Sequence, residues 1–346
     1  MPLRMVAAIG ARLYGWGVRV RRGLYARKWL SPKRLPAPVV SVGNLTVGGT
    51  GKTPMVACLA RFFQDRGNFV AILSRGYGGK HRGVTRLSDG LRLDFKPPEV
   101  GEEAYWLART LPGVAVYTGA CRYAAGMAAW EDLNPDLFLL DDGFQHVRLH
   151  RDLDLVLLDA ASPFGNGCLL PRGPLREPVS TLAAAHILIL TRFREESHLA
   201  RLQALREMFP QKTVLTAAIE PTKVRCYPAG EESAPATLKG RPLLAFAGLA
   251  RPEVFTRTLS ELEVDLKGFH AFPDHYAFKE QDLQTLLGEA YSHGAAGLVT
   301  SAKDWARLGE KWEAGLPLWV LEVEARLHQP LPGEFLAGIG EGGPGT

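Results

Sequence analysis

The stretch VGGTGKTP, at residues 47–54, contains the residue types that bind phosphate. Its Gly-Lys-Thr ending is typical of a phosphate-binding loop, although Thr46 stands where the strict GxxxxGK(S/T) pattern has its first glycine. A buried strand is expected at 38–45 and a helix at 55–67, so the backbone N–H groups of the loop would face an anion. Lys52 would reach the terminal phosphates of a nucleotide, and the Thr53 hydroxyl would hold Mg²⁺. The residues predicted to bind the nucleotide are Gly48, Gly49, Thr50, Gly51, Lys52 and Thr53.

A pair of acids, Asp141 and Asp142, follows directly after the apolar run 137–140. Carboxylates at the end of a buried strand lie at the carboxyl edge of a parallel sheet, where α/β proteins bind ligands. Because two adjacent acids cannot both ligate through one face, one is expected to bind Mg²⁺ together with Thr53 and the other to orient the metal or the nucleotide. Which acid does which stays open. Asp159, at the end of the next apolar run, is a weaker candidate that we interpret as structural.

Several classes of protein are disfavoured by the same residues. A GTPase would have a guanine-reading NKxD motif, and the nearest match, SAKD at 301–304, lacks the asparagine. A membrane-switch ATPase of the partition or cell-division type has a lysine directly before the paired glycines, where this chain has Val47. The four cysteines are far apart and show no metal-ligand or disulfide spacing, so we expect four reduced thiols.

The charge of the chain is unevenly distributed. Its 346 residues have a formal net charge of +5, but residues 1–36 contain nine basic residues and no acid, which leaves the remainder at −4. In this basic head, apolar and aromatic residues recur at roughly helical spacing among the arginines, which is typical of a helix that lies in an anionic membrane surface. A surface helix packed on the domain is one alternative. A nucleic-acid-binding arm is the other, and it is disfavoured because no groove-binding or base-stacking motif accompanies the charge.

Strands and helices are predicted to alternate after residue 36. To about residue 200 they predict an α/β fold with a doubly wound parallel sheet covered on both faces. No apolar run is long enough for a spanning helix and there is no secretory cleavage site, so the bulk of the protein is expected in the cytoplasm. The predicted parts are a basic amphipathic segment 1–36, a P-loop core 37–220, a connection 221–241, a second, smaller α/β domain 242–338 and a disordered tail 339–346.

Eight short motifs, in order and over nearly the whole chain, match one known family. They are SVGNLTVGGTGKTP, SRGYGG, VGEEA, LDDGFQH, LLPRGPLREP, AGLARPEVF, FPDHYAF and TSAKDWARL. The chain resembles tetraacyldisaccharide 4'-kinase, the lipid A 4'-kinase family of Gram-negative bacteria. The resemblance implies transfer of the γ-phosphate of ATP, with Mg²⁺, to the 4'-hydroxyl of a tetraacylated glucosamine disaccharide 1-phosphate. It also implies two α/β domains and an N-terminal helix on the cytoplasmic face of the inner membrane, where the acylated substrate resides.

The resemblance further implies an acid that accepts or orients the proton of the sugar hydroxyl. The family's GDEP motif aligns with GEEA at 101–104, so that Glu102 replaces the aspartate and Ala104 replaces the proline. Glutamate can perform the same proton chemistry with one more methylene of reach. Glu103 or another acid is the alternative base, and a solvated carboxylate in the first turn of a helix is the structural alternative. His275 of FPDHYAF resembles the family's histidine that pairs with this acid, and Lys52 completes the predicted catalytic residues.

Six further residues match family positions near the phosphates, the metal or the sugar. Arginine suits such positions because its planar guanidinium binds phosphate through two parallel hydrogen bonds. A structural ion pair is the alternative for any of them. Lys303 and Asp304 are expected on the second domain's side of the cleft, again with a structural salt bridge as the alternative. The predicted substrate-binding residues are Arg75, Tyr77, Arg122, His146, Arg176 and Glu177.

Together these residues predict a membrane-associated lipid kinase that depends on ATP and Mg²⁺. If Glu102 and His275 belong to different domains, closure of the domains around ATP would assemble the site. The alternative is a P-loop ATPase switch that binds membrane or a protein partner through the basic head and phosphorylates nothing. Nucleic acid is not expected as a partner, and the sequence makes no prediction of an oligomeric state.

Overall fold

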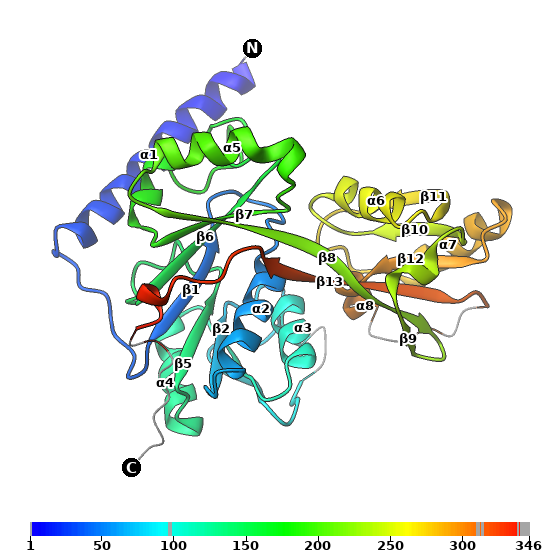
Figure 1. Ribbon diagram of the computed structural model, residues 1–346, viewed down its shortest axis with the longest axis horizontal. Helices are drawn as coiled ribbons and strands as arrows, with labels where there is room; N and C mark the ends of the chain where they lie inside the picture. The colour runs from blue at the N-terminus through cyan, green and yellow to red at the C-terminus, as the bar shows by residue number, and fades with distance from the viewer. Residues whose placement is uncertain (1, 96–98, 309–311, 313–314, 338, 340–346) are drawn as a thin grey trace.

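The computed structural model describes residues 2–95, 99–308, 312, 315–337 and 339. Two lobes lie side by side along the long axis of the molecule, and two long neighbouring strands join them (Figure 1). Within the described residues, 13 strands form one mixed sheet in the order β11-β10-β12-β13-β8-β7-β6-β1-β5-β2-β4-β3, with β9 paired to β8. We call the part with β1 to β7 the large lobe and the part with β10 to β12 the small lobe. The predicted α/β fold with a P-loop core and a second, smaller unit is confirmed.

The large lobe is built on buried parallel strands. Valine, isoleucine and leucine side chains fill both faces of these strands, which is the composition expected of a sheet covered by helices on both sides. One antiparallel edge strand, β3 (Thr85–Asp89), pairs with β4 and was not predicted from the sequence. The parallel strands are β1 (Val39–Asn44), β2 (Val70–Ser74), β4 (Ala115–Thr118), β5 (Leu137–Asp141), β6 (Leu153–Asp159) and β7 (Ile187–Thr191).

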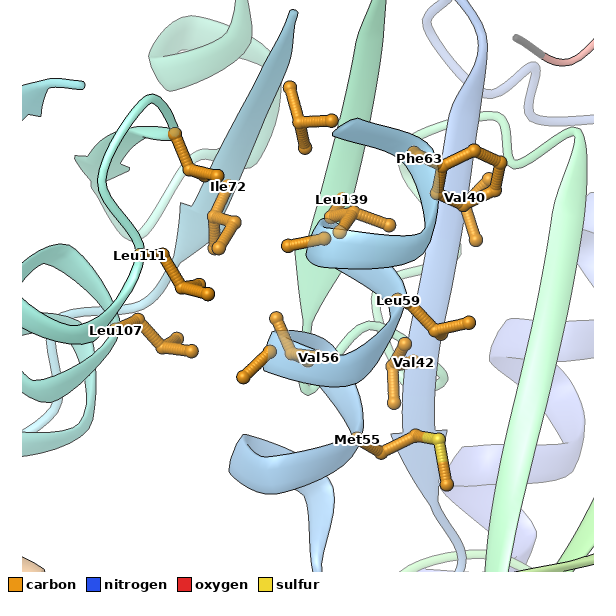
Figure 2. Close-up of a cluster of buried hydrophobic side chains, with 14 of the residues drawn as sticks. Val40, Val42, Met55, Val56, Leu59, Phe63, Ile72, Leu107, Leu111 and Leu139 are labelled. Atoms are coloured by element: carbon orange, nitrogen blue, oxygen red, sulfur yellow. The ribbon is translucent and has the colours of Figure 1, made fainter. Parts of the chain in front are cut away.

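Helices cover both faces of this sheet. On one face α2 and α3 pack together, with Leu59 and Phe63 of α2 against Val40 of β1 (Figure 2). α4 packs on the opposite face, and α5 packs against β6 and β7. Because α2 and α3 both begin at the carboxyl edge of the sheet, their first residues come close together there. These helices are α2 (Lys52–Gln64), α3 (Glu102–Thr110), α4 (Arg122–Leu133) and α5 (Glu195–Met208).

Two long antiparallel strands, β8 and β13, connect the lobes. β8 pairs with β7 at its start and with β13 along the rest, while β13 pairs with β12 in the small lobe. The remaining elements continue the alternation of strands and helices. They are β8 (Thr213–Tyr227), β9 (Glu231–Ser233), β10 (Pro242–Ala247), α6 (Pro252–Glu261), β11 (Asp265–Ala271), α7 (Glu280–Ser292), β12 (Gly297–Ser301), α8 (Ala302–Arg307) and β13 (Leu318–Leu327), with the 3-10 helices η1 (Val179–Ala184), η2 (Pro235–Leu238) and η3 (Gly333–Phe335).

The segment 221–241, interpreted from the sequence as a connection, contains regular structure. It includes the second half of β8, all of β9 and the 3-10 helix η2. Pro221 lies in β8 next to a shift of register, and Pro228 follows the end of the strand. The division of the chain into domains at the predicted boundaries stays a prediction. The predicted tail 339–346 lies outside the described residues except for Ile339.

Residues 2–26 of the basic head form one long helix, α1 (Pro2–Ala26), beside the large lobe (Figure 1). One face packs on the lobe through the buried Ala11 and Val18, and through Gly15, where a Cβ atom would come within 2.5 Å of a Leu169 side-chain carbon. From the sequence, a helix packed on the domain and a helix with an exposed apolar surface were alternatives. In the structure, α1 has one face of each kind. Among the described residues, no helix is long and apolar enough to cross a membrane. The exposed apolar stripe of α1 consists of Met5, Val6, Ile9, Leu13, Trp16 and Val20.

Candidate active site

The predicted nucleotide loop lies between β1 and α2, at the carboxyl edge of the sheet. Gly48 has φ 106° and Gly51 has φ 83°, values that residues with a side chain rarely adopt. These two glycines let the chain turn from the strand into the helix within a few residues. The first N–H groups of a helix have no partner within the helix, so the start of α2 presents donors to a phosphate group.

Three side chains fix the backbone of this loop. The Asn44 amide donates to the Thr50 hydroxyl at 2.9 Å, and the Thr191 hydroxyl donates to the Thr50 carbonyl at 2.9 Å. Arg192 donates to the Gly49 carbonyl at 2.8 Å. Neither Thr191 nor Arg192 was expected at the loop from the sequence, because they lie 141 and 143 residues beyond the residues they contact.

The paired aspartates lie next to the loop. Asp141 ends β5 and is buried, and Ser74 of the neighbouring β2 donates to one of its oxygens at 3.0 Å. Asp142 accepts from Arg176 at 2.8 Å, while Lys52 Nζ lies 3.6 Å from its Oδ1. The structure therefore brings together Lys52 of the loop, both predicted metal-binding aspartates and the predicted substrate-binding Arg176.

The two aspartates differ in their electrostatics. Burial, together with the nearby carboxylates of Glu103 and Asp142, raises the pKa of Asp141 to about 6. Burial acts in the same direction on Asp142, but Lys52 and Arg176 bring its pKa below the ordinary value. Asp141 Oδ1 is buried and has no hydrogen-bond partner among the described residues. A buried carboxylate with an unused oxygen, beside two other carboxylates, is an environment that a divalent cation stabilises.

Glu103, near the start of α3, completes what we call the acidic centre, the set of Glu103, Asp141 and Asp142. The Thr53 hydroxyl donates to Glu103 Oε1 at 3.3 Å, and Lys303 Nζ of the small lobe lies 2.5 Å from the same oxygen. The Lys303 charge lowers the pKa of Glu103 to about 2, against the effect of burial. No three His, Cys, Asp or Glu side chains converge as a ready ligand set within the described residues, so a magnesium ion here would also need oxygens of phosphate or water.

Glu102 and His275 meet across the two lobes. Glu102 begins α3, and His275 follows β11 with φ 59°, in the left-handed region that residues other than glycine adopt rarely. His275 Nδ1 lies 3.2 Å from Glu102 Oε2, although the two residues are 173 positions apart. The Tyr77 ring lies beside the imidazole, with ring centroids 5.6 Å apart. The structure therefore brings the predicted acid, the predicted histidine and Tyr77 together.

Arg307 contacts both members of this pair and was not among the site residues predicted from the sequence. Its Nε donates to Glu102 Oε2 at 2.6 Å, and Nη1 reaches both the Gly248 carbonyl and Asp304. Asp304 is fully buried and also accepts from the Gly248 N–H. Arg307 lies four residues after Lys303 on α8, and this spacing within TSAKDWARL was the signal that both side chains face the same way.

Hydrogen bonding sets the protonation of the Glu102 and His275 pair. The contact with Glu102 raises the pKa of His275 above its ordinary 6.5, against the effect of burial. Burial alone would raise the pKa of Glu102, but His275 and Arg307 bring it below the ordinary 4.5. At a pH between the two pKa values, an ionised carboxylate therefore faces a protonated imidazole.

Arg122 and His146 interact electrostatically with the same region. Arg122 is buried and donates to the Gly119 carbonyl at 3.0 Å, and it is attracted to Asp141 while burial lowers its pKa. Burial and nearby arginines, Arg122 among them, lower the pKa of His146 to about 4. The imidazole of His146 is therefore neutral near pH 7, where it offers hydrogen bonds but no charge.

Arg75 and Tyr77 are exposed on the segment that follows β2. Arg75 lines a hollow of about 300 Å³ together with His81, Arg82 and Gly101. Gly101 directly precedes Glu102, so the hollow lies next to the predicted base. Two arginines, a histidine and Glu99 line it, so cationic side chains outnumber the acid, which suits an anionic ligand.

The carboxylate of Glu177 contacts two arginines of α1. It is fully buried, and its two carboxylate oxygens accept from Arg21 and Arg22 at 2.9 and 2.7 Å. Arg22 also donates to the Phe144 carbonyl and lies over the Phe144 ring. The sequence left two roles open for Glu177, substrate binding and a structural ion pair. The observed contacts are those of a structural ion pair that joins α1 to the large lobe.

The fold and the site define a P-loop phosphotransferase, and comparison with known proteins gives the family. The family model for LpxK, tetraacyldisaccharide-1-P 4'-kinase, matches residues 3–339. Tetraacyldisaccharide 4'-kinases from Geobacter metallireducens and Geobacter sulfurreducens are each 42% identical over 95% of this chain and 96% and 91% of their own. A crystal structure of LpxK from Aquifex aeolicus in complex with ATP matches with a TM-score of 0.76 and 34% identity, over 94% of this chain and 96% of that one. The chain belongs to the tetraacyldisaccharide-1-P 4'-kinase family.

Family membership confirms the resemblance seen in the sequence. It assigns the chain to the ATP-dependent kinases of lipid A biosynthesis, and the switch ATPase is not favoured. The roles of individual site residues stay predictions.

Proposed function

We propose that this protein transfers the γ-phosphate of ATP to the 4'-hydroxyl of a tetraacylated glucosamine disaccharide 1-phosphate. The observation that supports this most directly is the 3.2 Å contact of Glu102 with His275, beside the nucleotide loop and the acidic centre. A switch ATPase needs a nucleotide loop and a metal site, but it has no need of an acid and a histidine that meet from two lobes. Membership of the family supports the same substrate.

The nucleotide loop and its cations would hold the phosphates of ATP. Lys52 lies 3.6 Å from Asp142, so its ammonium is already at the acidic centre. Arg176 contacts the same aspartate and adds a second cation. Thr53, Asp141 and Asp142 would hold Mg²⁺, which when bound supplies positive charge to the phosphoryl group in transfer.

The acceptor hydroxyl would be oriented by Glu102. Because His275 and Arg307 keep this carboxylate ionised, it can accept the hydrogen of the hydroxyl as the sugar oxygen attacks the γ-phosphorus. The bond from the γ-phosphorus to the bridging oxygen breaks, and ADP leaves. A strong base is not required, since charge in phosphoryl transfer lies mainly on the phosphoryl oxygens. The hollow lined by Arg75 is next to Glu102 and has room for a sugar.

The exposed stripe of α1 supports a place for the enzyme at the membrane. It presents large apolar side chains, and Arg12 and Arg19 lie in the same helix beside them. Such a helix binds anionic bilayers through buried apolar area and electrostatic attraction. We assign α1 to the cytoplasmic face of the inner membrane, where it would bring the site to an acylated substrate.

Transfer of label from γ-labelled ATP to lipid tests the proposal. Purified protein is incubated with labelled ATP, Mg²⁺ and tetraacyldisaccharide 1-phosphate in detergent, and the lipid and aqueous fractions are counted. Labelled lipid is expected from the wild type and from Lys239→Ala, a change of an exposed lysine. Lys52→Ala is expected to lose at least about 100-fold in rate, because it removes a cation at the transferring phosphate.

Two outcomes would contradict the proposal. Release of free phosphate without labelled lipid would show an ATPase that phosphorylates no lipid. A Lys52→Ala variant as fast as the wild type would refute the assignment of the nucleotide loop.

A further inference from the structure

Asp159 is the buried centre of a cluster of charges between the two lobes, and the two arginines around it are partly exposed. Asp159 ends β6 and is 4% exposed. Its Oδ2 atom lies 2.6 Å from Nη1 of Arg192 and 2.7 Å from Nη1 of Arg251. Arg192 directly follows β7 in the large lobe, whereas Arg251 directly precedes α6 in the small lobe. A single carboxylate oxygen therefore joins the two lobes.

The cluster reaches the nucleotide loop through Arg192. While Nη1 of Arg192 contacts Asp159, Nη2 donates to the Gly49 carbonyl at 2.8 Å. Arg192 has φ 53°, a conformation that residues with a side chain keep only where surrounding contacts fix it. A continuous path of one ion pair and two hydrogen bonds thus runs from Arg251 through Asp159 and Arg192 to the backbone of the loop.

Stability alone is a weak reason for such a cluster. Buried ion pairs lose hydration on folding, and apolar replacements of similar size are often neutral or stabilising. What a cluster of guanidinium groups on one carboxylate does fix is geometry, because each guanidinium has donors in set directions. Here the fixed geometry includes the Gly49 carbonyl, and neighbouring Thr191 fixes the Thr50 carbonyl at 2.9 Å.

We propose that Asp159, Arg192 and Arg251 are positioning residues that couple the placement of the small lobe to the shape of the nucleotide loop. With Arg251 on Asp159, Arg192 is held against Gly49 and the loop keeps the conformation that binds phosphate. Without the contact of Arg251 with Asp159, Arg192 is held less firmly against the Gly49 carbonyl, and the loop binds the nucleotide more weakly. The proposal rests on the part of the proposed function in which the loop binds ATP, and it needs no contact of the three residues with the nucleotide.

A second ion pair between the same elements provides a matched control. Arg194 Nη2 lies 2.6 Å from Glu261 Oε2, and so it also joins the segment after β7 to α6. Both side chains are largely exposed, and the contacts of Arg194 do not include the nucleotide loop. Arg194→Gln therefore removes an ion pair between the lobes that has no contact with the nucleotide loop. Arg251→Gln removes an ion pair that is connected to the loop through Asp159 and Arg192.

Calorimetric titration with ADP and Mg²⁺ tests the proposal, with the KM for ATP and the melting temperature measured on the same proteins. Arg251→Gln is expected to raise the ADP dissociation constant and the KM by about 3- to 30-fold, the range measured for coupling through contact networks. Arg251→Lys, which keeps the charge but not the planar fork, is expected to fall between it and the wild type. Arg194→Gln is expected to bind ADP within about twofold of the wild type.

Three results would overturn the proposal. The first is an Arg251→Gln variant with a lower melting temperature but unchanged ADP binding, because that is the behaviour of a purely structural contact. The second is an Arg194→Gln variant whose ADP binding is weakened as much as that of Arg251→Gln. The effect would then come from the loss of any ion pair between the lobes. The third is a wild type that does not bind ADP. A wild type that binds ADP but labels no lipid would refute the proposed function alone, and the coupling would still be measured.

Discussion

Glu102 and Glu103 are neighbours in the chain but have different partners. Glu102 contacts His275 of the small lobe, whereas Glu103 contacts Thr53 of the nucleotide loop and Lys303. Successive residues in the first turn of a helix point about 100° apart, so one helix start can serve two functions. Of the two acids that the sequence left open as the base, the contacts favour Glu102, and the contacts of Glu103 favour a place beside the proposed metal site. Both roles stay predictions.

The contact of His275 with Glu102 predicts a pH-dependent contribution to stability. The pKa of His275 is raised above 6.5 in the folded protein, so its contribution is complete below pH 6.5 and is lost as the pH rises through the raised pKa. The pKa of Glu102 is lowered below 4.5, so its contribution is complete above pH 4.5 and is lost as the pH falls through the lowered pKa. His275→Gln should therefore destabilise the protein more at about pH 5.5 than at about pH 9. Urea unfolding at both values measures this, and an equal effect would contradict it.

Asp141→Asn should separate stability from metal binding. The change replaces a buried carboxylate, whose pKa burial and neighbouring acids raise to about 6, by an amide of similar size. Loss of repulsion with Glu103 and Asp142 should raise the melting temperature at about pH 8, where a carboxyl group with a raised pKa lowers stability. Mg²⁺ is expected to increase the affinity of the wild type for ADP. In the Asp141→Asn variant this increase should be about 10- to 100-fold smaller.

Titration with ADP in the presence and absence of Mg²⁺ measures this effect, with Asp265→Asn as the control. Asp265 is an exposed acid on β11 in the small lobe. An Asp141→Asn variant that responds to Mg²⁺ like the wild type would remove Asp141 from the metal site.

Among the secondary-structure elements, those with local signals were predictable and those with distant partners were not. The buried strands of the large lobe and α2 follow from apolar runs and from the glycine-rich loop between β1 and α2. The second half of β8 was interpreted as part of a connection because prolines and glycines are frequent at 221–241 and few apolar residues recur there. Pro221 nevertheless lies in the strand, opposite Val323 at a shift of register, where an absent N–H is tolerated. The edge strand β3 was missed because its five residues, TRLSD, include a single apolar side chain and so show no apolar pattern.

The apolar stripe of α1 predicts a specific loss of membrane binding. Leu13 and Trp16 are each 67% exposed, so replacing both by glutamate should leave the melting temperature unchanged. Burial of each such side chain in a bilayer contributes about 1.5–3 kcal/mol, so the double variant should bind vesicles of anionic lipid at least about tenfold more weakly. Leu199→Glu, which changes an exposed leucine of α5, is the control. Vesicle flotation measures the effect, and recovery of the double variant equal to that of the wild type would exclude the stripe as a membrane surface.

In the whole molecule, the candidate site belongs to both lobes. Lys52 and Glu102 come from the large lobe, and His275, Lys303 and Arg307 come from the small lobe. The sequence pattern predicted the loop and the strand-end acids, and family resemblance supplied Glu102 and His275. The pattern could not predict that Arg307 holds Glu102 or that Asp159 joins the lobes, because those contacts depend on how β8 and β13 place one lobe against the other.

A double-mutant cycle in lipid phosphorylation tests most directly whether Glu102 and His275 act as one unit. Glu102→Gln should lower kcat by about 10²- to 10⁴-fold, the usual contribution of a general base. If the pair acts together, adding His275→Gln should lower kcat by no more than about threefold further, because the contact is already lost. If the two effects instead multiply, Glu102 and His275 act independently, and the site shared by the two lobes is not the one described here.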